Sequence, residues 1–590
     1  MTNAKRFTIA HVTHEAVEKV GGIGTVLEGL ITSPEYQAAV RRSIVVGSMG
    51  GHYLESPYKS LGSTTRLLYS SIDGIDKDGF GRRLRPIEWA FDVRIAYGVR
   101  RYHEDIENRV GDSEVLLIDV SNPNTARHNR FKGRLWERYG IDAARYERDW
   151  GFEEYSRLAE PSFYALSALL RDEELPCFLF SHEFMGLPPC YKAEMDGNDA
   201  FRTVFHAHEC STARAIVERE IGHDTAFYNI MRQARERGLF LEDVFGSQSS
   251  NMRHALISRV HHLDAVAAVG DYTADELRFL NDELAQAKVE VVYNGTPARA
   301  VSLEEKLDSR SRIDAWAERV AGFRPDLLMT HVARPVVSKG FWRDLKVASH
   351  LDAQLAEREQ RALLIILTCG APHRSFEQVE QMSRDYGWPM RHRTGFPDLS
   401  GPETEIWHAI EPFNATHTRL QVAFVNQFGW SRDRLGSSLD AGATFSDLRR
   451  ATDLEFGQSI YEPFGIAQVE PLSSGAICVI SSVCGCLGAF RQAAESVGMT
   501  ADDHPNLVVA DYTTLDSPWS IDDLKSMSQR QRDDIESSVA RIVAEQILRR
   551  LPLTNEDRRR LLETGSQVAS RMGWDSIVRD SLLPMLDAIR

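Results

Sequence analysis

The stretch Gln458–Ser482 reads QSIYEPFGIAQVEPLSSGAICVISS. Within it, Pro463–Gly465 predicts a turn, Ile466 begins a helical pattern, and a loop of small residues leads into the β-branched strand AICVISS. A helix that runs into such a strand is typical of a parallel sheet covered by helices. The free backbone amides at the start of that helix, near Gly465 and Ile466, would bind a phosphate. The stretch therefore predicts an α/β protein with an anion site at the end of a strand.

Two glutamates lie on either side of that turn. Glu462 precedes the helix, where its carboxylate can accept hydrogen bonds from sugar hydroxyls. Glu470 follows about two helical turns further along on the same face, within reach of the ribose hydroxyls of a nucleotide. As two isolated glutamates, the pair is equally consistent with a solvated helix.

Short apolar runs alternate with amphipathic stretches along the whole chain, which indicates parallel sheets. The runs are RFTIAHV, RRSIVVGS, EVLLIDV, CFLFSH, RTVFHAH, DAVAAVG and VEVVYN, then LLMTHVA, ALLIILTCG, QVAFVNQ and AICVISS. Between the two groups, the polar segment 296–316 suits a linker into the first helix of a second domain. A chain of 590 residues also exceeds the size at which one core keeps growing. We therefore predict two Rossmann-like domains, 1–310 and 311–565, followed by a terminal helix over 566–590.

Composition narrows the classes of function. The formal net charge is −16, which argues against nucleic acid or an anionic membrane as the main partner. No run approaches about 18 apolar residues, and the N-terminal MTNAKRFTIAHVTHE lacks a signal-peptide core. The seven cysteines are scattered without CxxC spacing, as expected of reduced core residues. We expect a cytoplasmic protein without a membrane partner.

Candidate anion-binding residues follow two of the apolar runs, where parallel sheets place their ligand sites. After the first run, Lys19, Gly21 and Gly22 lie in a loop that opens a helix, and the glycines would let the backbone approach an anion. A glycine turn made only for packing, beside a solvated lysine, explains the same residues. After LLMTHVA, Arg334 and Lys339 lie five residues apart and could close on one diphosphate. The alternative is a pair of surface cations.

Histidines follow two other runs. His206 and His208 alternate after RTVF, so that they face the same side of an extended segment. They could hydrogen-bond a sugar hydroxyl, serve the structure, or bind a metal, but a metal would require a third ligand that the spacing does not identify. We expect no metal. His182 and Glu183, after CFLF, form a similar polar pair, with functional and structural interpretations equally open.

Together these segments resemble the glycogen and starch synthases within the retaining GT-B glycosyltransferases. YEPFGIAQVE resembles the E-x7-E signature, KVGGIGTV the N-terminal glycine loop, and Arg334–Gly340 the basic pair R-x4-KG. VVYNGTP resembles the end of the N-terminal domain, and RYERDWGFEEYSRLAEPSFYAL, SHEFMGLPP and TVFHAHECSTAR resemble the animal and fungal branch, including the six-residue spacing of His208 and Arg214. The resemblance implies two Rossmann-like parallel-sheet domains that face a central cleft, with a C-terminal helix that crosses back to the N-terminal domain.

The resemblance also implies roles for single residues. The implied catalytic residues are His208, Arg334, Lys339 and Glu462, and the implied donor-binding residues are Lys19, Gly21, Gly22, Arg214, Gly465, Ile466 and Glu470. His208 would contact the donor sugar near the reaction centre, Glu462 the sugar hydroxyls and Glu470 the ribose. The basic pair would contact the diphosphate, and the N-terminal lysine and glycines would complete the phosphate pocket.

The implied reaction transfers glucose, with retention and without a metal or other cofactor, from UDP-glucose or ADP-glucose to the 4-hydroxyl of an α-1,4-glucan. Residues 80–150 and 370–440 lie outside the resemblance and include the loops expected to choose the nucleobase and the acceptor. A GT-B enzyme with a small-molecule, lipid or protein acceptor is therefore an alternative, as is a non-catalytic glucan-binding relative. The donor base, whether uridine, adenosine or guanosine, and assembly into a homo-oligomer are left open.

Overall fold

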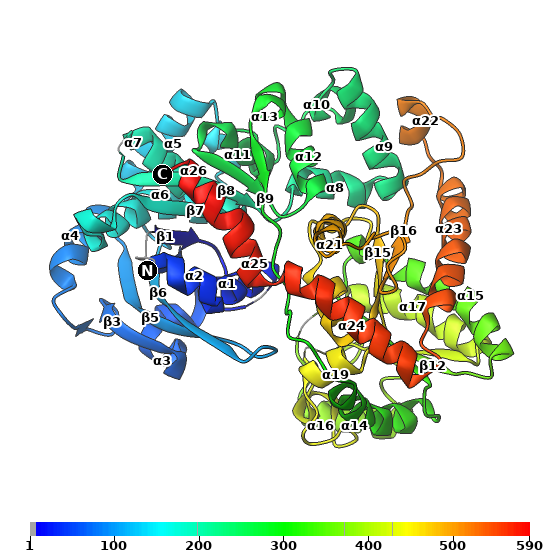
Figure 1. Cartoon of the computed structure of the whole chain (residues 1–590). Coiled ribbons are helices and arrows are strands. Elements are labelled where there is room, and N and C mark those ends of the chain that lie inside the picture. Colours follow the sequence, from blue (N-terminus) through cyan, green and yellow to red (C-terminus); the bar gives the residue numbers. More distant parts are fainter. Residues whose placement is uncertain (1–6, 20, 198, 371, 428) are drawn as a thin grey trace. The chain divides into compact units, whose positions relative to one another are not determined.

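The computed structural model describes residues 7–19, 21–197, 199–370, 372–427 and 429–590 (Figure 1). The chain divides into two compact units, each built around its own sheet. The first unit comprises Met1–Ala213, Ala234–Gly295 and Trp574–Arg590, and the second comprises Arg214–Gln233 and Thr296–Gly573. The two-sheet α/β organisation predicted from the sequence is confirmed.

The sheet of the first unit has ten strands in the order β10-β9-β8-β7-β1-β2-β6-β5-β3-β4. In chain order the strands are β1 Phe7–Val12, β2 Val40–Ser48, β3 Thr65–Ser70, β4 Ile75–Asp76, β5 Arg94–Glu104, β6 Arg109–Asp119, β7 Cys177–His182, β8 Phe201–Ala207, β9 Ala265–Ala268 and β10 Val289–Val291. From β10 to β6 the neighbouring strands run parallel. Since the chain reverses direction across the sheet between β1 and β7, ligands are expected at the carboxyl ends of these two strands.

The β5–β6 hairpin is a departure from the predicted parallel sheet. β5 pairs antiparallel with both β6 and β3. Only the residues 105–108 connect β5 to β6, and a connection this short cannot carry a parallel crossover. The expectation of parallel strands throughout is therefore wrong at this edge of the sheet.

Helices surround the first sheet, and the last part of the chain belongs to this unit. The helices are α1 Gly22–Thr32, α2 Pro34–Ala39, α3 Pro57–Ser60, α4 Gly81–Phe91, α5 Thr125–Tyr139, α6 Trp150–Leu169, α7 Leu187–Asp196, α10 Leu241–Phe245, α11 Met252–Ile257, α12 Asp271–Leu280, α13 Asp282–Gln286, α25 Trp574–Ile577 and α26 Leu583–Ala588. Trp574 packs against Gly29 of α1, where any larger residue would collide with the indole. Asp575 accepts a hydrogen bond from Ser33 at 2.5 Å and pairs with Arg109 at 3.1 Å. The predicted return of the C-terminal segment to the N-terminal unit is confirmed.

The sheet of the second unit has six parallel strands in the order β13-β12-β11-β14-β15-β16. The strands are β11 Leu327–Val332, β12 Ala362–Leu367, β13 Leu420–Val425, β14 Leu454–Gly457, β15 Ile477–Ser481 and β16 Leu507–Ala510. Numbered along the chain within this unit, the strands lie across the sheet in the order 3-2-1-4-5-6, which is the Rossmann order. The chain therefore changes direction across the sheet between the adjacent strands β11 and β14.

Helices cover both faces of this second sheet because its strands are apolar on both sides. The helices are α14 Leu303–Ala321, α15 Phe341–Glu357, α16 Phe376–Tyr386, α17 Pro402–Thr416, α18 Arg432–Leu435, α19 Phe445–Ala451, α20 Ile466–Val469, α21 Gly485–Ser496, α22 Ile521–Lys525, α23 Gln529–Arg550 and α24 Asn555–Met572. On one face, Leu364 and Ile366 of β12 share a core with α15, α17 and α23. On the other face, Leu363 and Ile365 share a core with α14, α16 and α19.

The boundary between the two compact units differs from the boundary predicted from the sequence. The polar segment predicted as a linker forms α14, where Ser309 donates a hydrogen bond to Asp447 and Arg310 pairs with Asp453, so this helix belongs to the second unit. The second unit thus begins at Thr296 rather than at residue 311, because the polar face of α14 is buried against charged partners.

The segment 214–233, which carries most of α8 Ser211–Arg219 and α9 His223–Glu236, also belongs to the second unit. Arg343 of α15, fully buried, donates hydrogen bonds to Asp224 at 2.6 and 2.9 Å and to Glu536 at 3.0 Å. These buried charges attach the segment to α15 and α23.

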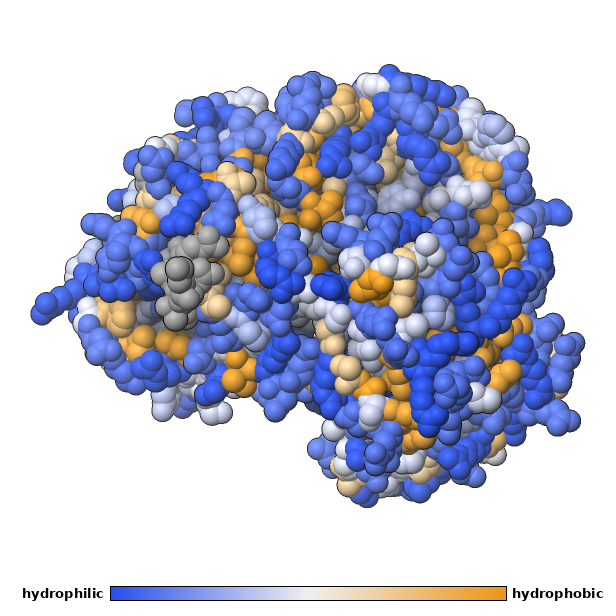
Figure 2. All heavy atoms as spheres, viewed as in Figure 1, coloured by the Kyte–Doolittle hydropathy of each residue, from blue (hydrophilic) through white to orange (hydrophobic). Residues whose placement is uncertain are grey.

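On the face shown in Figure 2, hydrophilic residues predominate and hydrophobic residues form small, separate patches. Among the helices that the structure describes, none combines the length and apolar character needed to cross a bilayer.

Candidate functional site

The two loops that carry Arg334, Lys339 and Glu462 leave neighbouring strands of the second sheet. One loop follows β11 and the other follows β14, which are hydrogen-bonded to each other. The loops are also joined directly, because the carbonyl of Ser338 accepts a hydrogen bond from the backbone N–H of Ile460 at 2.9 Å. In Rossmann sheets, ligands bind at the carboxyl ends of the two neighbouring strands between which the strand order reverses, here β11 and β14.

A glycine makes this close approach possible. Gly340 has φ +65°, and a Cβ atom there would lie 2.6 Å from the carbonyl oxygen of Gln458. An L-residue would be strained in this conformation and would push the two loops apart. The glycine of the R-x4-KG segment thus holds the basic loop against the loop that leads to Glu462.

Lys339 and Glu462 form an ion pair at the meeting point of the loops. Lys339 Nζ lies 2.5 Å from Glu462 Oε2, and the two side chains are only 16% and 14% exposed. Arg334, in contrast, is exposed, and its guanidinium has no hydrogen bond or ion pair with any residue that the structure describes. The lysine charge is balanced by its glutamate, so Arg334 supplies the uncompensated positive charge of this loop.

Gly465 and Ile466 lie at the start of α20, as the sequence predicts, but the helix is short. Gly465 has φ +93° and precedes a helix of four residues, Ile466–Val469, which continues as a 3-10 turn over Glu470–Ser474. The turn itself is anchored, because the carbonyl of Glu462 accepts a hydrogen bond from the backbone N–H of Gly485 at 3.1 Å. The predicted helix therefore begins where expected but ends after about one turn, since Pro471 interrupts the α-helical hydrogen bonding.

Glu470 pairs with an arginine that sequence reasoning missed. Its carboxylate lies 2.8 Å from Arg449 Nε, and Arg449 also pairs with Glu455 at 2.8 Å. Arg449 is buried, and a buried cation requires a nearby carboxylate to compensate its charge. The predicted contact between Glu470 and ribose stays a prediction, and it would have to coexist with this pair. No local pattern around Arg449 indicates its partners, which come from other elements.

The glycine loop of the first unit already holds a carboxylate. The backbone N–H groups of Gly21 and Gly24 both donate to Glu15 Oε2 at 2.9 Å, and Glu15 is buried. Gly22, the first residue of α1, is exposed. The amides that were predicted to bind phosphate thus bind an anion of the protein itself. A phosphate at these amides would have to displace Glu15.

Two further predicted donor-binding cations are paired with nearby carboxylates. Lys19 is half exposed and lies 2.8 Å from Glu28 of α1. Arg214 of α8 lies 2.9 Å from Glu218, one turn along the same helix. Both predictions remain untested, and both side chains would have to exchange a partner in order to bind a ligand.

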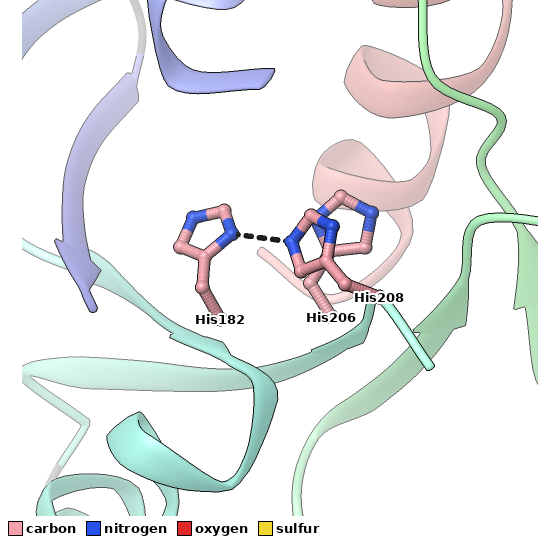
Figure 3. A group of neighbouring side chains, drawn as sticks. All are labelled: His182, His206 and His208. Atoms are coloured by element: carbon pink, nitrogen blue, oxygen red, sulfur yellow. Dashed lines mark hydrogen bonds between the residues drawn. The ribbon is translucent and has the colours of Figure 1, made fainter. Parts of the chain in front are cut away.

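Three histidines of the first unit, two buried and the third, His208, half-buried, lie together at the carboxyl ends of β7 and β8 (Figure 3). His182 ends β7 and is directly paired with His206 of β8, while His208 follows β8. His182 Nδ1 lies 2.8 Å from His208 Nε2, and His182 Nε2 lies 2.9 Å from His11 Nδ1. Burial lowers the pKa of His206 to about 4 and those of His182 and His208 well below their usual value. The three rings are therefore neutral at pH 7.

Glu183 orients the end of β8. This buried residue has φ +62°, and its Oε1 accepts hydrogen bonds from the backbone N–H groups of His208 at 2.5 Å and Glu209 at 2.6 Å. Burial and the neighbouring Glu209 raise the pKa of the Glu183 carboxyl well above its usual range. Of the two interpretations left open for Glu183, the structure favours the structural one, since both amide contacts fix the backbone that carries His208.

Several solved structures resemble the chain over nearly its whole length. No protein-family model and no curated protein matches the sequence. A structure described as trehalose-6-phosphate from E. coli bound with UDP-2-fluoro glucose superposes with a TM-score of 0.50 and 12% identity, covering 99% of both chains. A UDP-forming α,α-trehalose-phosphate synthase from Burkholderia xenovorans in complex with glucose-6-phosphate gives a TM-score of 0.51 and 12% identity, covering 99% of this chain and 100% of the other. At this identity the similarity establishes the fold, and the chain has the two-domain Rossmann-like GT-B fold predicted from its sequence.

Proposed function

We propose that the chain is a retaining glycosyltransferase that moves glucose from a nucleoside-diphosphate glucose to the 4-hydroxyl of an α-1,4-glucan. The observation that carries the proposal is the meeting of the loops after β11 and β14 where the strand order of the second sheet reverses. These loops carry two cations and a carboxylate that suit a sugar diphosphate, Arg334, Lys339 and Glu462, of which Lys339 and Glu462 are in contact.

The chemistry expected of these side chains is electrostatic. The bond between the anomeric carbon and the diphosphate oxygen breaks, and the acceptor hydroxyl oxygen bonds to that carbon on the same face. The acceptor proton passes to the departing phosphate oxygen, so no protein base is required. Negative charge grows on the diphosphate, and fixed cations such as Lys339 and Arg334 would stabilise it. Glu462 would accept hydrogen bonds from the glucose hydroxyls and so orient the ring.

His208 is the proposed contact to the donor sugar near the reaction centre. Burial keeps its ring neutral, so the imidazole could accept a hydrogen bond from a sugar hydroxyl without adding a charge. Its backbone is held by Glu183 and its Nε2 by His182, which leaves Nδ1 as the acceptor for this contact. Support for this role comes from the sequence resemblance and from the rigidity of the ring.

The test combines donors and acceptors in one screen. Purified full-length chain is incubated with UDP-glucose, ADP-glucose or GDP-glucose, each alone, with glycogen and with glucose 6-phosphate, and released nucleotide and glucosylated product are measured. Incorporation into glycogen with retained configuration is the expected result. Transfer to the phosphosugar alone would replace the glucan by a small-molecule acceptor. Nucleotide release with none of the donors would overturn the enzymatic proposal.

A pair of variants ties that activity to the site. Glu462→Gln keeps the size of the side chain and removes its charge, and we expect a loss of turnover of about a hundredfold or more. Glu318→Gln is the matched control, because Glu318 is an exposed glutamate on α14 of the same unit. Equal activity of the two variants would remove Glu462 from the proposed site.

A further inference from the structure

Three imidazoles of the first unit converge at one point. One ring nitrogen from each of His182, His206 and His208 lies within 4.8 Å of the others (Figure 3). The pairing of β7 with β8 places His182 beside His206, and the alternation of a strand returns His208 to the same side. From the sequence, a metal site was set aside because no third ligand could be identified beside His206 and His208. The structure supplies that ligand as His182.

His206 is the member of this group with the fewest hydrogen bonds. Its side chain is buried, and neither Nδ1 nor Nε2 forms a hydrogen bond of normal geometry with the residues that the structure describes, although the backbone of Val292 lies beside the ring. A buried polar atom without a partner destabilises the fold, and such atoms in native proteins often indicate an ion or a water. Since the two unpartnered nitrogens belong to a ring that faces two other imidazoles, a bound cation would satisfy one of them.

A chain of hydrogen bonds fixes which nitrogen of His182 carries a lone pair. Tyr36 donates its hydroxyl proton to Ser43 at 3.1 Å, so its oxygen accepts from His11 Nε2 at 2.8 Å. His11 Nδ1 is then an acceptor, and it receives the Nε2–H of His182 at 2.9 Å. The lone pair of His182 therefore lies on Nδ1, where it accepts the Nε2–H of His208 at 2.8 Å, and a metal ion between the two rings would take the place of that proton. Metal-binding histidines are commonly held in this way, by a hydrogen bond from the nitrogen that does not bind the metal.

We propose that His182, His206 and His208 bind one divalent zinc ion at the carboxyl ends of β7 and β8. Three neutral imidazoles form the ligand set of open tetrahedral zinc sites, in which the fourth position holds water or a substrate atom. His11 is a positioning residue that orients His182. The site does not depend on the proposed transferase activity, and zinc on His208 Nε2 would leave Nδ1 available to a sugar.

Metal binding by the full-length chain tests the proposal directly. The protein is stripped with a chelator, dialysed, and titrated with zinc by calorimetry and with cobalt by visible absorption, which reports tetrahedral coordination. We expect one ion per chain at micromolar or lower concentration, the intense cobalt bands of a tetrahedral site, and a zinc-dependent rise in unfolding temperature. Absence of binding by the folded wild-type chain, or binding with an octahedral cobalt spectrum, would overturn the proposal.

Variants assign the ligands. His206→Ala removes a ring that forms no side-chain hydrogen bond among the described residues, so it should preserve the fold, shown by an unchanged circular dichroism spectrum, while abolishing the cobalt bands. His11→Phe should keep the stoichiometry and weaken affinity by about tenfold to a hundredfold, as is usual when the partner of a ligand is lost. His103→Ala, at an exposed position of the same unit, is the matched control and should bind like the wild type. Undiminished binding by His206→Ala would show that the ion lies elsewhere.

Discussion

Separating Lys339 from Glu462 provides a test of the second-unit site that does not require knowledge of the substrate. The two side chains form a pair that is about six-sevenths buried. Breaking a fully buried pair destabilises a protein by about 3–5 kcal/mol, whereas exposed pairs contribute about 0–1 kcal/mol. With the remaining exposure taken into account, Lys339→Met or Glu462→Gln alone should lower the free energy of unfolding by about 1–3 kcal/mol. In a unit of this size, this corresponds to a fall in unfolding temperature of about 2–8 °C.

The double variant measures the interaction free energy between Lys339 and Glu462. When both charges are removed, neither is left buried alone, so the loss in Lys339→Met/Glu462→Gln should be smaller than the sum of the two single losses by about 1 kcal/mol or more. Urea unfolding of the four proteins measures this difference, and Lys525→Met on α22 controls for loss of an exposed lysine. Losses that add to within about 0.5 kcal/mol would show that the two side chains do not interact and would refute the reasoning.

Other predictions concern the backbone and the buried charges of the second unit. Arg343→Met leaves Asp224 buried without its cation and Glu536 with Lys346 at 3.0 Å. It should cost about 3–5 kcal/mol in urea unfolding, and a loss below about 1 kcal/mol would contradict the buried-cluster assignment. Burial raises the pKa of Glu536, but Arg343, Lys346 and Trp342 together outweigh burial and hold that pKa at about 2. Because this pKa is depressed in the folded state, the ionised carboxylate stabilises the fold above pH 5, and about 3 kcal/mol of that stability is lost as the pH falls toward 2. Glu536→Gln should therefore flatten the plot of unfolding free energy against pH between pH 5 and pH 2. Gly340→Ala should reduce the free energy of unfolding by about 1–3 kcal/mol, because it separates the loops after β11 and β14. It should also reduce the stabilisation by bound nucleotide, measured as the thermal shift with UDP, ADP and GDP. A thermal shift equal to that of the wild type would show that nucleotide binding does not require contact between the two loops.

The strand ends were the part of the site that the sequence could predict. Apolar runs mark the strands, and the polar residues after them are local in sequence, so the loops of Lys339 and Glu462 could be located without knowing the sheet order. That these two loops meet depends on the pairing of β11 with β14, which lie far apart in the chain. The pairing could be expected from the Rossmann order but not from the residues of either loop.

The partners of the buried charged residues could not be predicted from the sequence. Arg449 lies in an amphipathic helix with nothing to distinguish it from a solvated arginine, and its two carboxylates come from β14 and from the turn after α20. The third histidine is an intermediate case. β7 and β8 are consecutive strands, and consecutive strands are often neighbours, so the pairing of His182 with His206 could have been considered as soon as both strands were recognised.

The loop before α1 and the loop after β11, which were both predicted to bind phosphate, differ in charge balance, and the sequence did not reveal this difference. In the first unit, the amides at the start of α1 are bonded to Glu15, so an incoming anion gains little there and must first displace a buried carboxylate. In the second unit, Lys339 is balanced by Glu462, while Arg334 is exposed and its guanidinium has no partner among the described residues. Charge balance therefore favours the loop after β11 for the diphosphate. It also predicts that Arg334, which looked like the more ordinary surface cation, contributes more to nucleotide affinity than Lys19.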